Sequence, residues 1–200
     1  MRTAAVTIFA MLALGCTYGP AEDLLLVQNV ALRPDGAVLA AIVKYERFRP
    51  ATGLAAFPDG GVRRVLEQRA DLYILDLETR SLLFQGSIPA PPNRRVSFSP
   101  WLIGWSNDRV YFQITGCSGS PGSECHGPLV GTSFFTLSQD GAIVASAAPA
   151  SITLQSSVND GSRFVSVGTE SYGVSVRYER GATRSPVLRF AGARLEPVRP

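Results

Sequence analysis

The chain has 200 residues, of which 46% are hydrophobic and 18% charged, a composition that supports a packed core and argues against disorder. Its formal net charge is +3, and loss of Arg2 with an N-terminal leader leaves 18 basic and 16 acidic residues, a net +2. So small an excess, without a run of basic residues, would not hold a polyanion at physiological salt, so we expect no nucleic-acid partner. The 19 Gly and 14 Pro indicate many turns within a single domain.

The N-terminus has the pattern of an export signal. Arg2 precedes an apolar stretch of 11 residues, Ala4–Leu14, which is too short to span a bilayer as a helix and is followed by Gly15 and Cys16. We therefore expect residues 1–15 to be a signal peptide. The stretch Leu-Ala-Leu-Gly-Cys ending at Cys16 resembles the lipobox of bacterial lipoproteins. An ordinary cleaved signal with an incidental cysteine and a buried N-terminal helix are the alternatives.

The lipobox resemblance implies a location and a partner. In that family the cysteine is lipidated and becomes the mature N-terminus, so Cys16 would anchor the chain to a membrane and residues 16–23 would form a lipidated tether. The protein would then belong to the bacterial cell envelope and face the periplasm. Thr17 stands where Asp favours inner-membrane retention in Gram-negative lipoproteins, which points to the outer membrane.

Two further cysteines, Cys117 and Cys125, lie in a loop rich in Gly and Ser. An even number of remaining cysteines in an oxidising compartment predicts a disulfide, and the flexible loop allows the chain to turn back. Free thiols are one alternative. A metal site with His126, the only histidine, is another, but the spacing lacks the short Cys-x2–4-Cys pattern of zinc sites. We expect no metal and no cofactor.

Alternation of apolar and polar residues predicts an all-β domain over residues 24–190, followed by a C-terminal tail over residues 191–200. Val110, Phe112 and Ile114, for example, would share one face of a strand. Asp-Gly dipeptides, as at Asp35, mark hairpin turns. The expected strands form three groups of four: Leu24–Leu32, Val38–Tyr45, Asp71–Leu77 and Ser81–Ile88; Val96–Ile103, Val110–Thr115, Ser133–Leu137 and Ile143–Ser146; Ile152–Ser157, Phe164–Thr169, Tyr172–Tyr178 and Pro186–Phe190.

A strand, a Pro/Asn-Asp-Gly turn and a second strand, followed later by the turn Asp76–Thr79, resemble the blades of WD-like or PD-repeat β-propellers of exported bacterial proteins. The resemblance implies a propeller-like array of three four-stranded antiparallel meanders, with a β-sandwich or barrel as the alternative. Two apparent insertions, Arg47–Arg69 and Gly116–Gly131, follow the second strand of their meanders. We expect them to form one partner-facing surface that the β-scaffold does not need.

Motifs of catalysis are not visible in the sequence. There is no nucleophile elbow and no phosphate-binding glycine loop. His126 is the only histidine, so any serine triad would need it as the general base. The densest acidic group, around Asp71, Asp76 and Glu78, is better explained by turn formation. Carboxylate pairs that meet only in space stay possible, so the alternative to a non-catalytic protein is an envelope hydrolase of glycan or peptide with an acid pair in a propeller mouth.

Trp101 and Trp105 are the only tryptophans, and their spacing of four predicts that they share one face of a strand. That face is either core or a stacking platform for a sugar or peptide, so Trp101, Trp105 and His126 are candidate binding residues. We expect an envelope-anchored, non-catalytic lipoprotein that binds or scaffolds an envelope protein or glycan through its loops.

Overall fold

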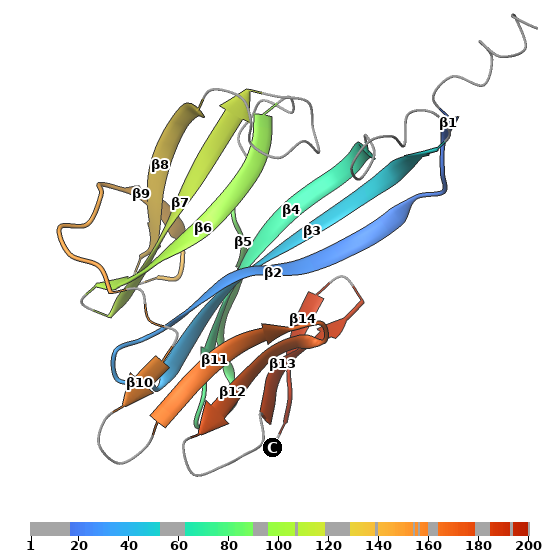
Figure 1. Cartoon of the computed structure of the whole chain (residues 1–200). Helices are drawn as coiled ribbons and strands as arrows, with labels where there is room; N and C mark the ends of the chain where they lie inside the picture. Colours follow the sequence, from blue (N-terminus) through green and yellow to red (C-terminus); the bar gives the residue numbers. More distant parts are fainter. Residues whose placement is uncertain are drawn as a thin grey trace, which may run out of the picture.

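The computed structural model describes residues 17–52, 63–89, 96–106, 108–118, 129–138, 140–153, 155, 157–159, 164–178, 185–192 and 194–199. All regular structure within these residues is β-strand, arranged in three antiparallel sheets (Figure 1). The predicted all-β class and its three antiparallel sheets are confirmed, but two of the sheets have five strands instead of four. The strand expected over Ile152–Ser157 is wrong, because the described residues there form only an isolated bridge from Thr153 to Trp105 before a strand that begins at Ser157. The described residues do not show a closed ring of sheets.

The first sheet contains five strands and is built around β3. Its strands are β1 (Thr17–Tyr18), β2 (Glu22–Leu32), β3 (Val38–Thr52), β4 (Arg63–Asp76) and β5 (Leu82–Ser87). β3 pairs with β4 on one side, and with β2 and β1 in succession on the other. β5 completes the sheet next to β4.

The second and third sheets are simple meanders, in which each strand pairs with the next strand in sequence. The second contains β6 (Val96–Ser106), β7 (Arg109–Ser118), β8 (Leu129–Leu137) and β9 (Ile143–Ser146). The third contains β10 (Ser157–Asn159), β11 (Phe164–Glu170), β12 (Gly173–Tyr178), β13 (Ser185–Ala191) and β14 (Arg194–Pro197).

The first sheet lies between the other two, and both of its faces are covered (Figure 1). On one face Leu39, Ala41 and Val43 of β3 pack with Val174 and other side chains of the third sheet. On the opposite face the alternate β3 residues, such as Ile42, pack with Leu102, Phe112 and other side chains of the second sheet. Two apolar faces explain why the start of β3, Val38–Val43, is apolar throughout instead of alternating.

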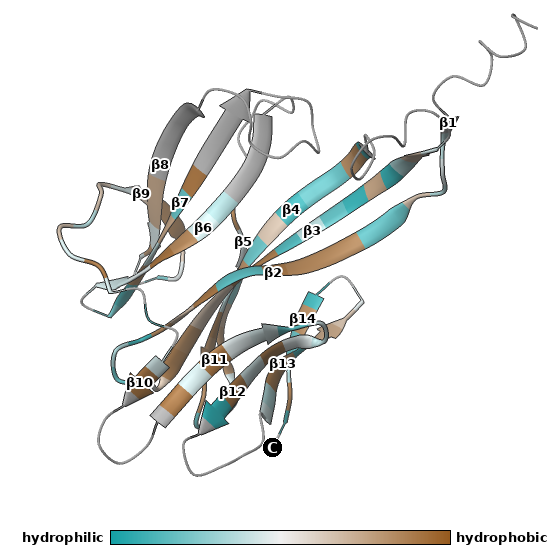
Figure 2. Ribbon diagram, in the orientation of Figure 1, coloured by the Kyte–Doolittle hydropathy of each residue, from teal (hydrophilic) through white to brown (hydrophobic). Residues whose placement is uncertain are grey.

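Beyond this two-sided core the first sheet continues as a three-stranded arm, made of residues 17–26, 44–52 and 63–69. β3 and β4 turn from mostly apolar to mostly polar where they enter the arm, whereas β2 stays apolar over Leu24–Leu26 and becomes polar only at its start (Figure 2). From the Val43–Asp71 pair to Thr52 the arm is about 30 Å long, at about 3.3 Å per residue. Thr17 pairs with Thr52 at its far end.

Several predicted boundaries differ from the structure. The apparent insertion Arg47–Arg69 is largely the paired continuation of β3 and β4, so the interpretation of its paired residues as an insertion is wrong. β7 and β8 likewise continue to Ser118 and from Leu129. The expected tether contains β1 and the start of β2, and the expected C-terminal tail contains β14, whose Leu195 is only 2% exposed.

Candidate functional site

Two hairpin turns and the segment before β10 surround a cavity of about 370 Å³ at the end of the first sheet opposite the arm. That volume is in the range of small-molecule pockets. Two adjacent turns supply its carboxylates, Asp35 from the β2–β3 turn and Asp108 from the β6–β7 turn. The lining residues are Arg33, Pro34, Asp35, Trp105, Ser106, Asp108, Ser151 and Thr153.

The β2–β3 turn has the geometry that its Asp-Gly dipeptide predicts. Gly36 has a φ of 75°, a left-handed conformation that glycine adopts without a steric penalty. The Asp35 carboxylate accepts a hydrogen bond of 2.9 Å from the backbone N–H of Ala37, which closes the turn. Asp108 has a φ of 61° in the equivalent turn of the second sheet, a conformation that Asp tolerates better than most residues.

Charge pairing governs the chemistry of the cavity wall. The Arg33 guanidinium contacts the Asp35 carboxylate through Nη2 at 2.6 Å and Nε at 2.9 Å. This hydrogen-bonded pair lowers the pKa of Asp35 and raises that of Arg33. A general acid for glycoside cleavage needs a raised pKa, so Asp35 has the opposite of the required property. The wall is better suited to hydrogen bonding with a polar ligand than to proton transfer.

The two tryptophans lie on opposite faces of β6, so the prediction that they share one face is wrong. The register between β6 and β7 shifts between Leu102 and Gly104, which leaves Ile103 as one extra residue on β6. Such a bulge reverses the side-chain alternation beyond it. Trp101 is 43% exposed on the outer face, whereas Trp105 is 4% exposed in the core between the first two sheets.

Trp105 is a structural residue that also forms part of the cavity wall. Its indole N–H donates a hydrogen bond of 3.1 Å to the carbonyl of Ala31 on β2. Its backbone N–H and carbonyl form two hydrogen bonds of 3.1 Å with Thr153. Nearby, the Asn29 amide donates to the Leu102 carbonyl at 2.9 Å and accepts from the Leu102 N–H at 3.1 Å. These contacts fix the second sheet, and with it one side of the cavity, against β2.

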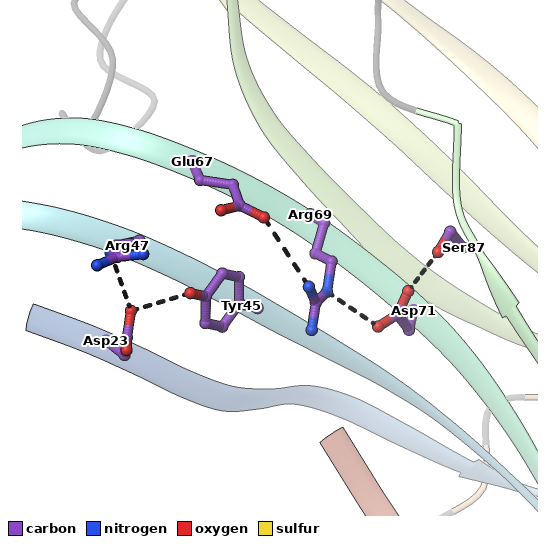
Figure 3. A network of polar contacts seen from close by, with 7 residues as sticks. All are labelled: Asp23, Tyr45, Arg47, Glu67, Arg69, Asp71 and Ser87. Atoms are coloured by element: carbon purple, nitrogen blue, oxygen red, sulfur yellow. Dashed lines mark hydrogen bonds and ion pairs between the residues drawn. The ribbon is translucent and has the colours of Figure 1, made fainter. Parts of the chain in front are cut away.

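A second polar feature lies at the base of the arm (Figure 3). Asp71, whose side chain is 10% exposed, accepts a hydrogen bond of 2.7 Å from Ser87 and lies 3.4 Å from Arg69. The Arg69 guanidinium is also 4.5 Å from the centre of the Tyr45 ring. The Tyr45 hydroxyl donates to Asp23 at 2.9 Å, which raises the pKa of that hydroxyl. The network joins four strands, β2 to β5.

No family model, curated protein or solved structure matches this chain. The described residues contain no group of three or more His, Cys, Asp or Glu side chains that could hold a metal ion. In the same part of the chain, no helix is long and apolar enough to cross a membrane.

Four of the residues singled out from the sequence fall outside the described side chains. Cys16, Cys125 and His126 are not described, and of Cys117 only the backbone is, opposite Ser97 and Leu129 in the second sheet. The predicted disulfide and the predicted lipidation therefore stay predictions. Of the candidate binding residues, Trp101 and Trp105 are described, and they do not lie together.

Proposed function

We propose that this protein is an envelope-anchored, non-catalytic lipoprotein that binds another envelope component, a protein or a glycan, through its β-domain. The observation that carries the proposal is the position of the chain start. Thr17, the residue after the lipobox cysteine, pairs with Thr52 at one end of β3, while the cavity lies beyond Val38 at the other. A lipid on Cys16 would thus attach at the end of the molecule farthest from the cavity, with the binding surface directed away from the membrane.

Binding is favoured over hydrolysis by the chemistry of the cavity. One of its two carboxylates, Asp35, is held ionised by Arg33, so it can accept hydrogen bonds but is a poor proton donor. Trp101, 43% exposed on the outer face of the second sheet, adds a contact residue of the kind enriched at interfaces. We therefore assign the partner contact to the second sheet and the adjoining cavity.

The anchor is tested by Cys16→Ser. The wild-type protein should carry acyl chains by mass spectrometry and remain with the membrane fraction, because several chains hold stably where one binds only marginally. The Cys16→Ser protein should lack the acyl mass and move to the soluble fraction. A soluble, unmodified wild-type protein would rule out the lipoprotein assignment.

The binding role is tested by a pull-down from detergent-solubilised envelopes with wild type and Trp101→Ala. Leu83→Ala is the matched control, because Leu83 is 56% exposed and belongs to β5 of the first sheet. We expect Trp101→Ala to weaken capture of the partner and Leu83→Ala to leave it unchanged. Equal capture by all three proteins would exclude Trp101 from the contact surface. Turnover of envelope glycan or peptide that is lost in Asp108→Asn would overturn the non-catalytic assignment.

A further inference from the structure

The far end of the arm carries four side chains on one face, which we call the tip face: Tyr18, Arg47, Arg49 and Arg64. Arg47 and Arg49 are two residues apart on β3 and so share a face. Arg64 lies directly opposite Arg49 on β4. Tyr18 is paired with Ala51, two residues beyond Arg49. Arg49 and Arg64 are exposed, and Tyr18 is 40% exposed.

Among the residues that the structure describes, the charges on this face are not balanced toward the tip. Arg47 lies 3.8 Å from Asp23, and Arg69, nearer the core, lies between Glu67 and Asp71. Among the described residues, neither Arg49 nor Arg64 has a carboxylate within ion-pairing distance. Two like charges directly opposite each other destabilise a pair of strands, so stability of the sheet does not account for this pairing. An anion bound between them would.

The sequence places the lipobox cysteine at the same end of the arm. Thr17 pairs with Thr52, and Thr52 is three residues, about 10 Å, from Arg49 along β3. Cys16 is the next residue before Thr17, so its Cα is about 3.8 Å from that of Thr17. An acyl chain on Cys16 would hold the tip at the membrane surface, where the headgroup region is about 5–7 Å thick on each side.

We propose that the tip face binds anionic phospholipid headgroups of the membrane that holds the Cys16 lipid. This inference rests on the proposed lipoprotein anchor. Arginine suits the role because its planar guanidinium forms paired hydrogen bonds to phosphate oxygens. Tyr18 adds an aromatic ring with a polar tip, a side chain suited to the boundary between apolar and aqueous surroundings. The acyl chains attach the protein, and the tip face sets how the arm meets the surface.

The test measures vesicle binding with the soluble, exported form of Cys16→Ser, so that no acyl chain masks the contribution of charge. The probes are vesicles of phosphatidylcholine alone and of phosphatidylcholine with a third phosphatidylglycerol. The readout is the ratio of the two binding constants by co-sedimentation. We expect a preference for the anionic vesicles that weakens as salt is added.

In that background, Arg49→Ala combined with Arg64→Ala should lower the preference about 25-fold, or about fivefold per arginine near a charged surface. Lysine at both positions should retain most of the preference. The charge-matched control is Arg177→Ala with Arg189→Ala, two exposed arginines of the third sheet. It should leave the ratio unchanged.

The outcomes separate this inference from the anchor. No preference for anionic vesicles, or an equal loss with both arginine pairs, overturns the lipid contact even if mass spectrometry finds acyl chains on Cys16. A preference that depends on Arg49 and Arg64 supports the contact even if no acyl chain is found, in which case the anchor alone fails. The double variant Arg49→Ala, Arg64→Ala could also bind vesicles as before but no longer capture an acidic envelope protein in the pull-down. That result would assign the tip face to the protein and overturn the proposal.

Discussion

Replacement of Trp105 by Phe removes one hydrogen bond and part of one buried ring. The indole N–H bond to the Ala31 carbonyl lies in the interior, and a hydrogen bond of this kind contributes about 0.5–1.5 kcal/mol net. The smaller ring leaves unfilled space next to Leu102 and Val110, which costs about 1 kcal/mol more. We expect the free energy of unfolding to fall by about 2 kcal/mol in total.

Thermal unfolding followed by circular dichroism measures this loss. For a chain of this size, about 2 kcal/mol corresponds to a fall in Tm of about 4–8 °C. Trp101→Phe is the control, because Trp101 is 43% exposed and surface substitutions usually change stability by less than about 0.5 kcal/mol. Equal shifts for the two variants would refute the bulge at Ile103 and the assignment of the two tryptophans to opposite faces.

Two further predictions concern the backbone. In Gly104→Ala the added Cβ overlaps the Thr153 carbonyl oxygen at a φ of +136°, so we expect the free energy of unfolding, measured by urea unfolding, to fall by about 3 kcal/mol. Gly192→Ala, with nothing within 4 Å of the added atom, should lower it clearly less. Asp76 accepts hydrogen bonds from Thr79 that lower its pKa, so Asp76→Ala should cost about 1 kcal/mol near neutral pH. Because the folded-state pKa lies below the unfolded value, that difference should shrink as urea titrations move below about pH 4, and a constant difference would exclude the carboxylate as its source.

Short-range chemistry made much of the scaffold predictable from sequence. The Asp-Gly dipeptide at Asp35 identified a hairpin, because only a residue that tolerates positive φ fits there, and Gly36 has a φ of 75°. The turn after Asp76 was equally readable, since an Asp side chain can accept hydrogen bonds from the backbone two and three residues later, as it does here. A continuous apolar run is typical of a strand covered on both faces, as Val38–Val43 is, whereas the run Leu24–Val27 does not follow the rule, because Leu24 and Leu26 are exposed.

The arm was missed because apolar alternation was the signal used for strands. Its faces are polar or mixed, and they are held together by cross-strand pairs such as Asp23 with Arg47 and by the Tyr45 hydroxyl. The register between β3 and β4 decides which charged side chains lie opposite each other. A bulge at Leu66 shifts that register, and no residue type in the sequence predicts the bulge. Leu66 is 46% exposed, because as the extra residue of the bulge it does not follow the alternation of its strand.

The candidate site was predictable only in part. Trp101 and Trp105 were identified, but the bulge at Ile103 reversed their relation. The cavity draws on Arg33, Ser151 and other residues more than seventy positions apart in sequence, which come together only because β6 and β2 meet across the sheets. A local pattern carries no information about such a contact.

The central place of the first sheet affects the order in which the chain can fold. Synthesis proceeds from the N-terminus, so β2, β3 and β4 are complete before either covering sheet exists. Until β6–β9 and then β11–β14 arrive, the nascent sheet presents two apolar surfaces and a free edge at β2, features that favour aggregation. The polar, charged arm at one end of these same strands keeps part of that early sheet soluble. The core is complete only when the last strand, β14, places Leu195 in it.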